Sequence, residues 1–217
     1  MAILELVGNA NGELPKRVRV ILSIPDIIAI GSKIIDRLSA KQGKLIMEYT
    51  SKHLPPIVII KGNEVSFPTI RFWEFKLDDE VFIGVSGDDQ PMSTNGMFEM
   101  AYAITKVLLE TKPREVIVLG TIISEKAKEG GIYTVAPGKE GPGGEILGLN
   151  GMIPAMMYEM EKIPYKVITV ALKNPAFVGI NENEVCGSLI RELERVTGHK
   201  IDSCESEDNE FAKAIYS

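Results

Sequence analysis

The fold is decided around residues 18–26, where the chain runs Val18-Arg19-Val20-Ile21-Leu22-Ser23-Ile24-Pro25-Asp26. The first five of these residues are rich in β-branched side chains, which predicts a buried strand. Ser23 to Asp26 form a turn able to start a helix. The apolar residues beyond this turn recur at helical spacing and are Ile27, Ile28, Ile34, Ile35 and Leu38. A buried strand followed by a helix is typical of α/β proteins.

The alternation of strands and helices continues to residue 197. Further strands are predicted at 44–50, 57–60, 71–76, 80–85, 115–119 and 165–172, with turns at Gly62-Asn63 and Asp78-Asp79. Helices are predicted from Ser93 or Thr94 to about Thr111, at 152–161 and at 184–197, with Gly198 as the stop. Strands that alternate with crossover helices predict an α/β fold whose mainly parallel or mixed sheet is covered on both faces.

The charge of the chain divides it into two parts. The 217 residues are 45% apolar and 25% charged, with a net charge of −6. The last 17 residues carry a net charge of −4, from Asp202, Glu205, Glu207, Asp208 and Glu210 against Lys213. We therefore expect a single α/β domain at residues 1–200 and an acidic, solvated tail at residues 201–217.

Composition and patterning exclude several classes of protein. The longest stretch without a charged residue, 146–158, has 13 residues, whereas a membrane-spanning helix needs about 18. The Lys and Arg residues form no basic cluster, so nucleic acid is not an expected partner. The first segment lacks a basic start and carries Glu5 where a secretory signal would be apolar. A membrane partner is therefore not expected either, and we expect a cytoplasmic protein.

The sequence offers no signature of catalysis or of a cofactor. The candidate nucleophiles Ser23, Ser86, Ser93 and Cys186 lie in no Gly-x-Ser-x-Gly or Cys/His motif. The two histidines, His53 and His199, lack metal-ligand spacing and are predicted to be structural. Two cysteines, Cys186 and Cys204, are too few for a disulfide framework or a metal cluster. We expect no catalytic, cofactor or metal site.

Two weaker ligand patterns leave alternatives open. The Gly-rich segment Gly138 to Gly144 precedes a helix and favours either an anion site or a flexible surface loop. Gly87-Asp88-Asp89-Gln90-Pro91 closes a strand. Asp88 and Asp89 either share a proton or a metal at the carboxyl edge of the sheet, or only make hydrogen bonds in a turn.

Five segments, taken in order and spacing, resemble the proteasome assembly chaperone 2 (PAC2) family, especially its archaeal members. They are Ser23-Ile24-Pro25 with Gly31, the run from His53 to Lys61, Gly87 to Pro91, Val116 to Gly120, and Gly148-Leu149-Asn150-Gly151-Met152. The resemblance spans roughly residues 17–202. It implies a three-layer α/β/α domain, similar in architecture to nucleoside phosphorylases and hydrolases. It also implies a homo-oligomer without established catalytic residues that binds the α subunits of the 20S proteasome.

The sequence departs from the family at one turn and adds a feature at its end. Family members usually carry Gly-Phe-Pro-Gly-x-Gly where this chain has Ser23 to Ile28, which keeps the proline and loses the glycines. A ligand site in that turn is therefore disfavoured. The chain ends in Ile215-Tyr216-Ser217, which resembles the hydrophobic-tyrosine-any-residue (HbYX) ending of proteasome activators and some assembly chaperones.

Three hypotheses follow from the sequence. The first is a non-catalytic homo-oligomeric assembly chaperone, or ATP-independent activator, whose partner-binding residues Ile215, Tyr216 and Ser217 dock into the 20S proteasome α-ring. The second is a small-molecule enzyme that uses Asp88 or Asp89 and the Gly138–Gly144 loop. The third is an oligomeric scaffold for another partner.

Overall fold

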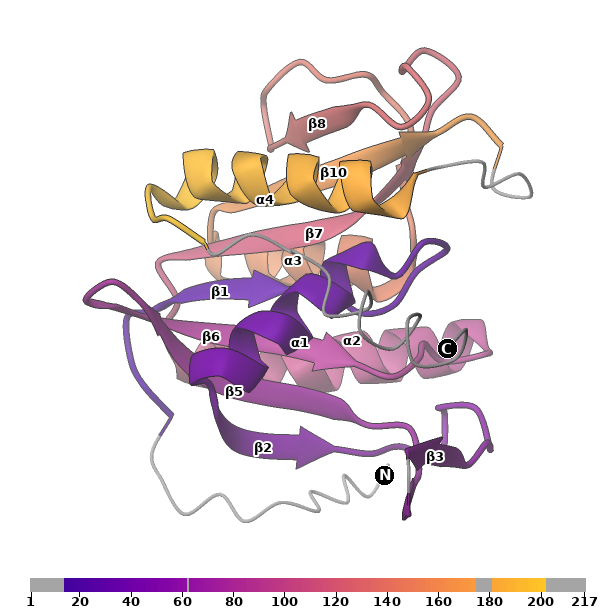
Figure 1. The fold of residues 1–217 in the computed structure, drawn as a ribbon, viewed down its shortest axis with the longest axis vertical. Coiled ribbons are helices and arrows are strands. Elements are labelled where there is room, and N and C mark those ends of the chain that lie inside the picture. Colours follow the sequence, from indigo (N-terminus) through magenta and orange to yellow (C-terminus); the bar gives the residue numbers. More distant parts are fainter. Residues whose placement is uncertain (1–13, 62, 175–180, 202–217) are drawn as a thin grey trace, which may run out of the picture.

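The structure, a computed structural model, describes residues 14–61, 63–174 and 181–201 (Figure 1). Its elements follow one another as β1 (Arg19–Leu22), α1 (Ile30–Gln42), β2 (Lys44–Tyr49), β3 (Ile59–Lys61), β4 (Glu64–Ser66), β5 (Ile70–Leu77), β6 (Glu80–Gly87), α2 (Thr94–Glu110), β7 (Glu115–Ile123), β8 (Ile132–Val135), β9 (Glu145–Ile146), α3 (Gly148–Glu161), β10 (Tyr165–Leu172) and α4 (Glu182–Thr197). Within these residues, no helix combines the length and the apolar character needed to cross a membrane.

The main sheet has eight strands and is mixed. Seven of them lie in the order β2-β5-β6-β1-β7-β10-β8, and β9 pairs with β7. The centre is parallel, because β1 runs parallel to both β6 and β7, and β7 runs parallel to β10. The outer pairs β2–β5, β5–β6 and β8–β10 are antiparallel. The predicted mixed α/β sheet is confirmed.

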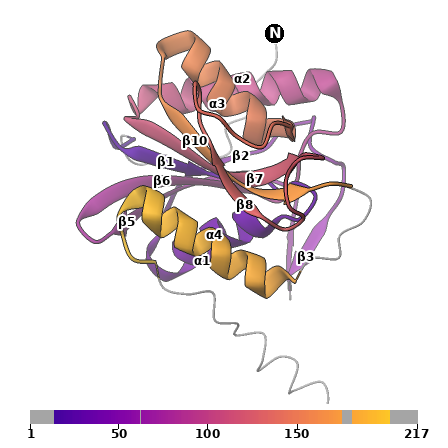
Figure 2. The same cartoon turned by 90° about the horizontal axis from the view of Figure 1, so that it is seen from above.

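Helices cover both faces of this sheet. In Figure 2, α2 and α3 lie on one face, and α1 and α4 lie on the other. The side chains of β1 alternate between the two layers: Val20 and Leu22 pack in the core under α2 and α3, and Ile21 packs in the core under α1 and α4. Each such fully buried aliphatic side chain stabilises the fold by about 1.5–3 kcal/mol. The three-layer α/β/α architecture is confirmed.

The predicted start of the first helix is wrong by several residues. Ile27 and Ile28 lie outside α1, which begins at Ile30. Asp26 causes the delay, because its Oδ1 accepts hydrogen bonds from the backbone N–H groups of Ile28 and Ala29, both at 3.3 Å. These bonds fold the chain into an Asx turn that ends with Ala29 at φ 49°. The helix starts only after that turn.

Other element boundaries agree more closely with the sequence. α2 begins after Ser93, whose Oγ accepts the backbone N–H of Gly96 at 3.1 Å. Gly198 ends α4 at φ 79°, a conformation that suits glycine. The helix predicted at 152–161 begins four residues earlier, at Gly148. The short strands β8 and β9 were not predicted, and each pairs with a longer strand of the main sheet.

The predicted strand at 57–60 is only partly correct. β3 begins at Ile59 and pairs with β4 as a separate two-stranded sheet, outside the main sheet. This hairpin lies at the lower right of Figure 1, beyond the end of β2. Its apolar residues are therefore not part of the buried core.

Candidate functional site

Three of the segments that carry the family resemblance meet at the carboxyl edge of the parallel strands. They are the turn after β1, the turn after β6 and the first turn of α3. β1 lies between β6 and β7, with α1 and α2 on opposite faces, so this edge is a topological switch point. Ligands of open α/β sheets bind at such points. This edge is therefore the first place to look for a functional site.

Asn150 fastens α3 to the turn after β1. The side chain is fully buried; its Oδ1 accepts the backbone N–H of Ile24, and its Nδ2 donates to the Ile24 carbonyl oxygen, both at 2.8 Å. A longer contact of 3.5 Å joins Nδ2 to Asp26 Oδ2. Asn150 thereby satisfies both backbone groups of a buried residue that has left the strand ladder.

Gln90 fastens the turn after β6 to the same two segments. Its Nε2 donates to the Pro25 carbonyl oxygen at 2.6 Å, and its Oε1 accepts the backbone N–H of Leu149 at 3.0 Å. Gly148, at φ 56°, lets the chain pass close by, because a side chain there would overlap the Gln90 amide. The amides of Gln90 and Asn150 thus interlock the three segments where a ligand would otherwise bind.

The two carboxylates predicted at this edge do not act as a pair. Asp88 forms a bidentate ion pair with Arg71, in which Nη1 lies 3.0 Å from Oδ1 and Nη2 lies 2.6 Å from Oδ2. Asp88 Oδ2 also accepts hydrogen bonds from the backbone N–H and the side-chain hydroxyl of Thr69. Asp89 instead accepts the backbone N–H of Gln90 at 2.7 Å. An arginine therefore neutralises Asp88, and the hypothesis of a proton or metal shared with Asp89 is wrong for this geometry.

The Gly-rich loop does not lead directly into a helix, which disfavours the first of its two interpretations, an anion site at a helix start. Gly138 to Gly144 lie between β8 and β9, and β9 separates the loop from α3. The first turn of α3 already donates the N–H of Leu149 to Gln90. The structure agrees with the alternative, a surface loop, since most of its residues are exposed.

A charged network lies at the opposite, amino edge of the sheet. Glu80 accepts hydrogen bonds from Arg19 at 3.1 and 2.5 Å and pairs with Arg114 and His199. Hydrogen bonding from Arg19, supported by His199 and Arg114, lowers the pKa of Glu80 to about 2. His199 Nδ1 lies 2.8 Å from Asp78, and hydrogen bonds to Asp78 and then to Glu80 raise the pKa of His199 above 6.5.

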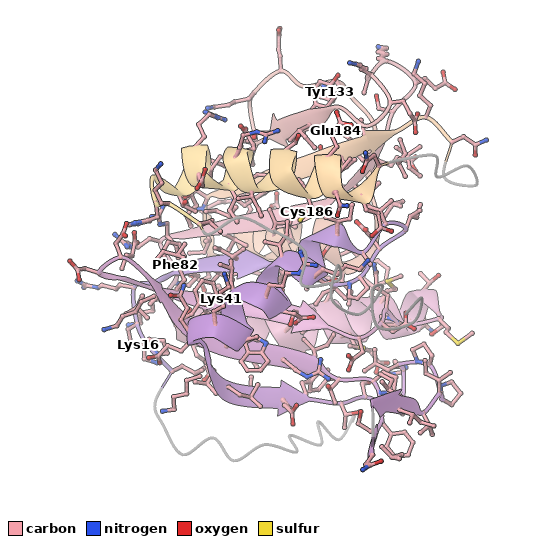
Figure 3. The ribbon with its side chains drawn as sticks, viewed as in Figure 1. Lys16, Lys41, Phe82, Tyr133, Glu184 and Cys186 are labelled. Atoms are coloured by element: carbon pink, nitrogen blue, oxygen red, sulfur yellow. The ribbon has the colours of Figure 1, made fainter. Side chains whose placement is uncertain are left out.

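This network joins the end of α4 to the β5–β6 turn. Arg19 also donates to the Thr197 carbonyl oxygen at 2.8 Å and stacks over the Phe82 ring at 4.8 Å. An open cavity of about 570 Å³ beside it is lined by both acidic and basic groups. Figure 3 labels Phe82 and Lys16 on this side of the molecule. Among the described residues, no group of three or more His, Cys, Asp or Glu is placed to hold a metal.

The remaining residues singled out in the sequence have structural surroundings. His53 Nε2 lies 2.7 Å from Glu99 Oε2 and joins the loop after β2 to α2. Ser86 Oγ donates to Asp36 at 2.6 Å, while Ser23 is buried beside Gly31. Cys186 is buried on α4 in the core that α4 shares with α1 (Figure 3). Cys204 lies outside the described residues.

Comparison with known proteins identifies solved structures that have a similar fold. No family model matches the chain, and no curated protein matches its sequence. Among solved structures, the archaeal proteasome activator PbaB of Pyrococcus furiosus superposes with a TM-score of 0.76 at 19% identity, covering 100% of both chains. The chain shares the fold of that activator. Pyrococcus furiosus PbaA, an archaeal homolog of proteasome-assembly chaperone, gives 0.69 at 16% identity, over 94% of this chain and 86% of the other.

A third solved structure with the same fold comes from a bacterium. A PAC2 family protein from Streptomyces avermitilis gives a TM-score of 0.63 at 14% identity, covering 84% of this chain and 87% of the other. The resemblance found in the sequence is thus confirmed at the level of the fold. The residues that interlock at the carboxyl edge of this chain belong to the segments on which that resemblance was based.

The sequence analysis did not predict the exposed apolar side chains at the β3–β4 hairpin. Five large apolar side chains around the β3–β4 hairpin are 47–71% exposed, and we call them the hairpin patch: Ile57, Val58, Ile60, Val65 and Phe67. The alternation of Val65 and Phe67 after Gly62-Asn63 could have indicated a hairpin with an apolar face. The predicted partner-binding residues Ile215, Tyr216 and Ser217 lie outside the described residues.

Proposed function

We propose that this protein is a non-catalytic, homo-oligomeric assembly chaperone, or ATP-independent activator, of the archaeal 20S proteasome in the cytoplasm. Membership of the PAC2 family is part of the proposal. The observation that carries it is the fold shared with PbaB along the whole of both chains. The ending Ile215-Tyr216-Ser217 supports it independently, since this is the pattern expected of a tail that docks on the proteasome α-ring.

The chemistry of the last three residues suits a pocket between α subunits. The terminal carboxylate of Ser217 can pair with a lysine, and a charge-assisted bond of this kind is stronger than a neutral one. Burial of Ile215 and of the Tyr216 ring is worth about 1.5–3 kcal/mol each. The residues between 202 and 210 include five acidic side chains, counting Asp202 and Glu210, and like charges in a linker repel one another, which suits a segment that has to reach a partner.

Oligomerisation would make this weak contact effective. Ordering the tail on binding would cost part of the gain from burying two side chains, so one tail alone binds weakly. Several tails on one oligomer bind with a high effective concentration, provided that their spacing matches the spacing of the pockets. The function we propose therefore depends on self-association.

The carboxyl edge of the sheet supports a role other than catalysis. Asn150 and Gln90 bind backbone groups of this chain at the switch point, and Asp88 is paired with Arg71. The side chains of Asn150, Gln90 and Asp88 therefore bond within the chain, at the place where an α/β enzyme would direct polar groups at a substrate. PbaB is described as an archaeal proteasome activator, and PbaA as an archaeal homolog of proteasome-assembly chaperone.

Co-migration with 20S core particles on a sizing column tests this function. We expect the full-length protein to co-migrate and a chain lacking residues 215–217 to elute alone, with its oligomeric state unchanged. Peptidase activity of the bound particles then separates the two roles, because an activator raises it and an assembly chaperone does not. Failure of the full-length protein to bind would reject the proposal.

A further inference from the structure

The hairpin patch leaves an unusual amount of apolar surface open to water. Ile60, Val65 and Phe67 are 71%, 69% and 67% exposed, and Ile57 and Val58 about half exposed. Five large apolar side chains exposed to this degree form a surface on the order of the 300–600 Å² that the largest patch on a typical monomer covers. The largest apolar patch on a protein is often a functional surface.

The hairpin also lacks the support that small sheets need. β3 and β4 pair over three positions, with Ile60 opposite Val65, and neither pairs with another strand among the described residues. An isolated two-stranded hairpin is only marginally stable in water, and its outer edges can accept another chain. A partner that covers this hairpin would therefore stabilise it as well as bury its side chains.

Charge and area both favour a second copy of this chain as that partner. The segment 57–67 carries one lysine and one glutamate, a net charge of zero, although the whole chain carries −6. Two such segments can meet without net like-charge repulsion. A two-fold contact centred on the patch would bury its polar rim as well to reach the roughly 800 Å² that each partner buries in a standard interface.

The position of the hairpin fits a contact of this kind. The hairpin lies beyond the end of β2, whereas α4 ends at the opposite, amino edge, where His199 is bonded to Asp78 and Glu80 (Figure 1). Residues 202–217 begin just after that point. Self-association through the hairpin would thus keep Ile201, which precedes residues 202–217, away from the interface.

We propose that the hairpin patch is the surface through which two copies of this protein associate. This inference rests on the homo-oligomer of the proposed function and assigns its contact surface. It names residues that the docking tail does not include, so the two can be tested separately.

Sedimentation equilibrium of the full-length chain and of charge variants tests this surface. Val65→Glu and Ile60→Glu put a carboxylate at facing positions of β4 and β3, and we expect each to weaken self-association by more than about tenfold. Met160→Glu is the matched control, because it makes the same change at an exposed apolar residue of α3, and it should leave association unchanged. Far-UV circular dichroism checks folding.

Each outcome supports or overturns the inference. If the hairpin strands do not tolerate a carboxylate, Phe67→Glu carries the test, because residue 67 lies after β4. Oligomers that persist in all folded hairpin variants would overturn the hairpin interface and leave the proposed proteasome role intact. Variants that stay oligomeric but lose core-particle binding would make the hairpin a partner surface instead. A monomeric wild-type protein would refute both the interface and the oligomer.

Discussion

Replacing Asn150 with alanine removes the side chain that ties α3 to the turn after β1. The substitution leaves the N–H and the C=O of Ile24 without their 2.8 Å partners, in a residue that is completely buried. Each unsatisfied buried group costs about 1–3 kcal/mol. Asn150→Ala should therefore lower the free energy of unfolding by about 3–5 kcal/mol, a large part of the roughly 5–15 kcal/mol available to a domain.

Urea denaturation followed by circular dichroism measures this loss. The midpoint should fall while the slope stays the same, because the amount of surface exposed on unfolding does not change. Asn95→Ala is the control: Asn95 is exposed in the first turn of α2, so its replacement should change stability by less than about 0.5 kcal/mol. A cost of less than about 1 kcal/mol for Asn150→Ala would refute the argument that this amide interlocks the segments.

Three further substitutions test other contacts. Arg71→Ala leaves Asp88 nearly buried without its cation and should cost about 2–4 kcal/mol in urea denaturation; an unchanged midpoint would contradict it. Gly31→Ala puts a methyl group 2.7 Å from a β7 side chain and should cost about 1–3 kcal/mol in the same assay, whereas a gain in stability would show that the helix can shift. Protonated His199 stabilises the fold fully below pH 6.5, its ordinary pKa, and this contribution is lost as pH rises through its raised folded-state pKa. Thermal unfolding of His199→Gln should therefore be flatter above pH 6.5 than that of the wild type, and parallel curves would argue against the contribution. The lowered pKa of Glu80 acts in the other direction, since its contribution is present above pH 4.5 and is lost as pH falls through about 2.

The layers and central strands could be predicted because their signals are local. β10 was predicted at 165–172 and is found there, since a run of β-branched residues in a buried strand needs little context. The cap at Ser93 and the stop at Gly198 were likewise predictable from single residues. The delayed start of α1 was not, because the two bonds made by the Asp26 side chain outweighed the helical spacing of Ile27 and Ile28.

The contacts of the candidate site depend on residues far apart in the chain. Asn150 and Ile24 are 126 positions apart, and no pattern in either segment predicts that one side chain satisfies the other's backbone. The pairing of Asp88 with Arg71 also required the structure, because the antiparallel β5–β6 register places Arg71 opposite Ser86. The hairpin patch escaped prediction since four successive apolar residues favour a buried strand as readily as an exposed one.

Binding of the protein to immobilised 20S core particles, measured by surface plasmon resonance, is the most direct test of the proposed function. Wild type, Tyr216→Ala and Ser217→Ala are compared, because Ser217→Ala keeps the terminal carboxylate and changes only the residue that the tail pattern leaves open. We expect Tyr216→Ala to weaken binding by at least about tenfold, the equivalent of ~1.4 kcal/mol, and Ser217→Ala to bind like the wild type. Equal affinity of wild type and Tyr216→Ala, or no binding by the wild type, would contradict docking through the tail.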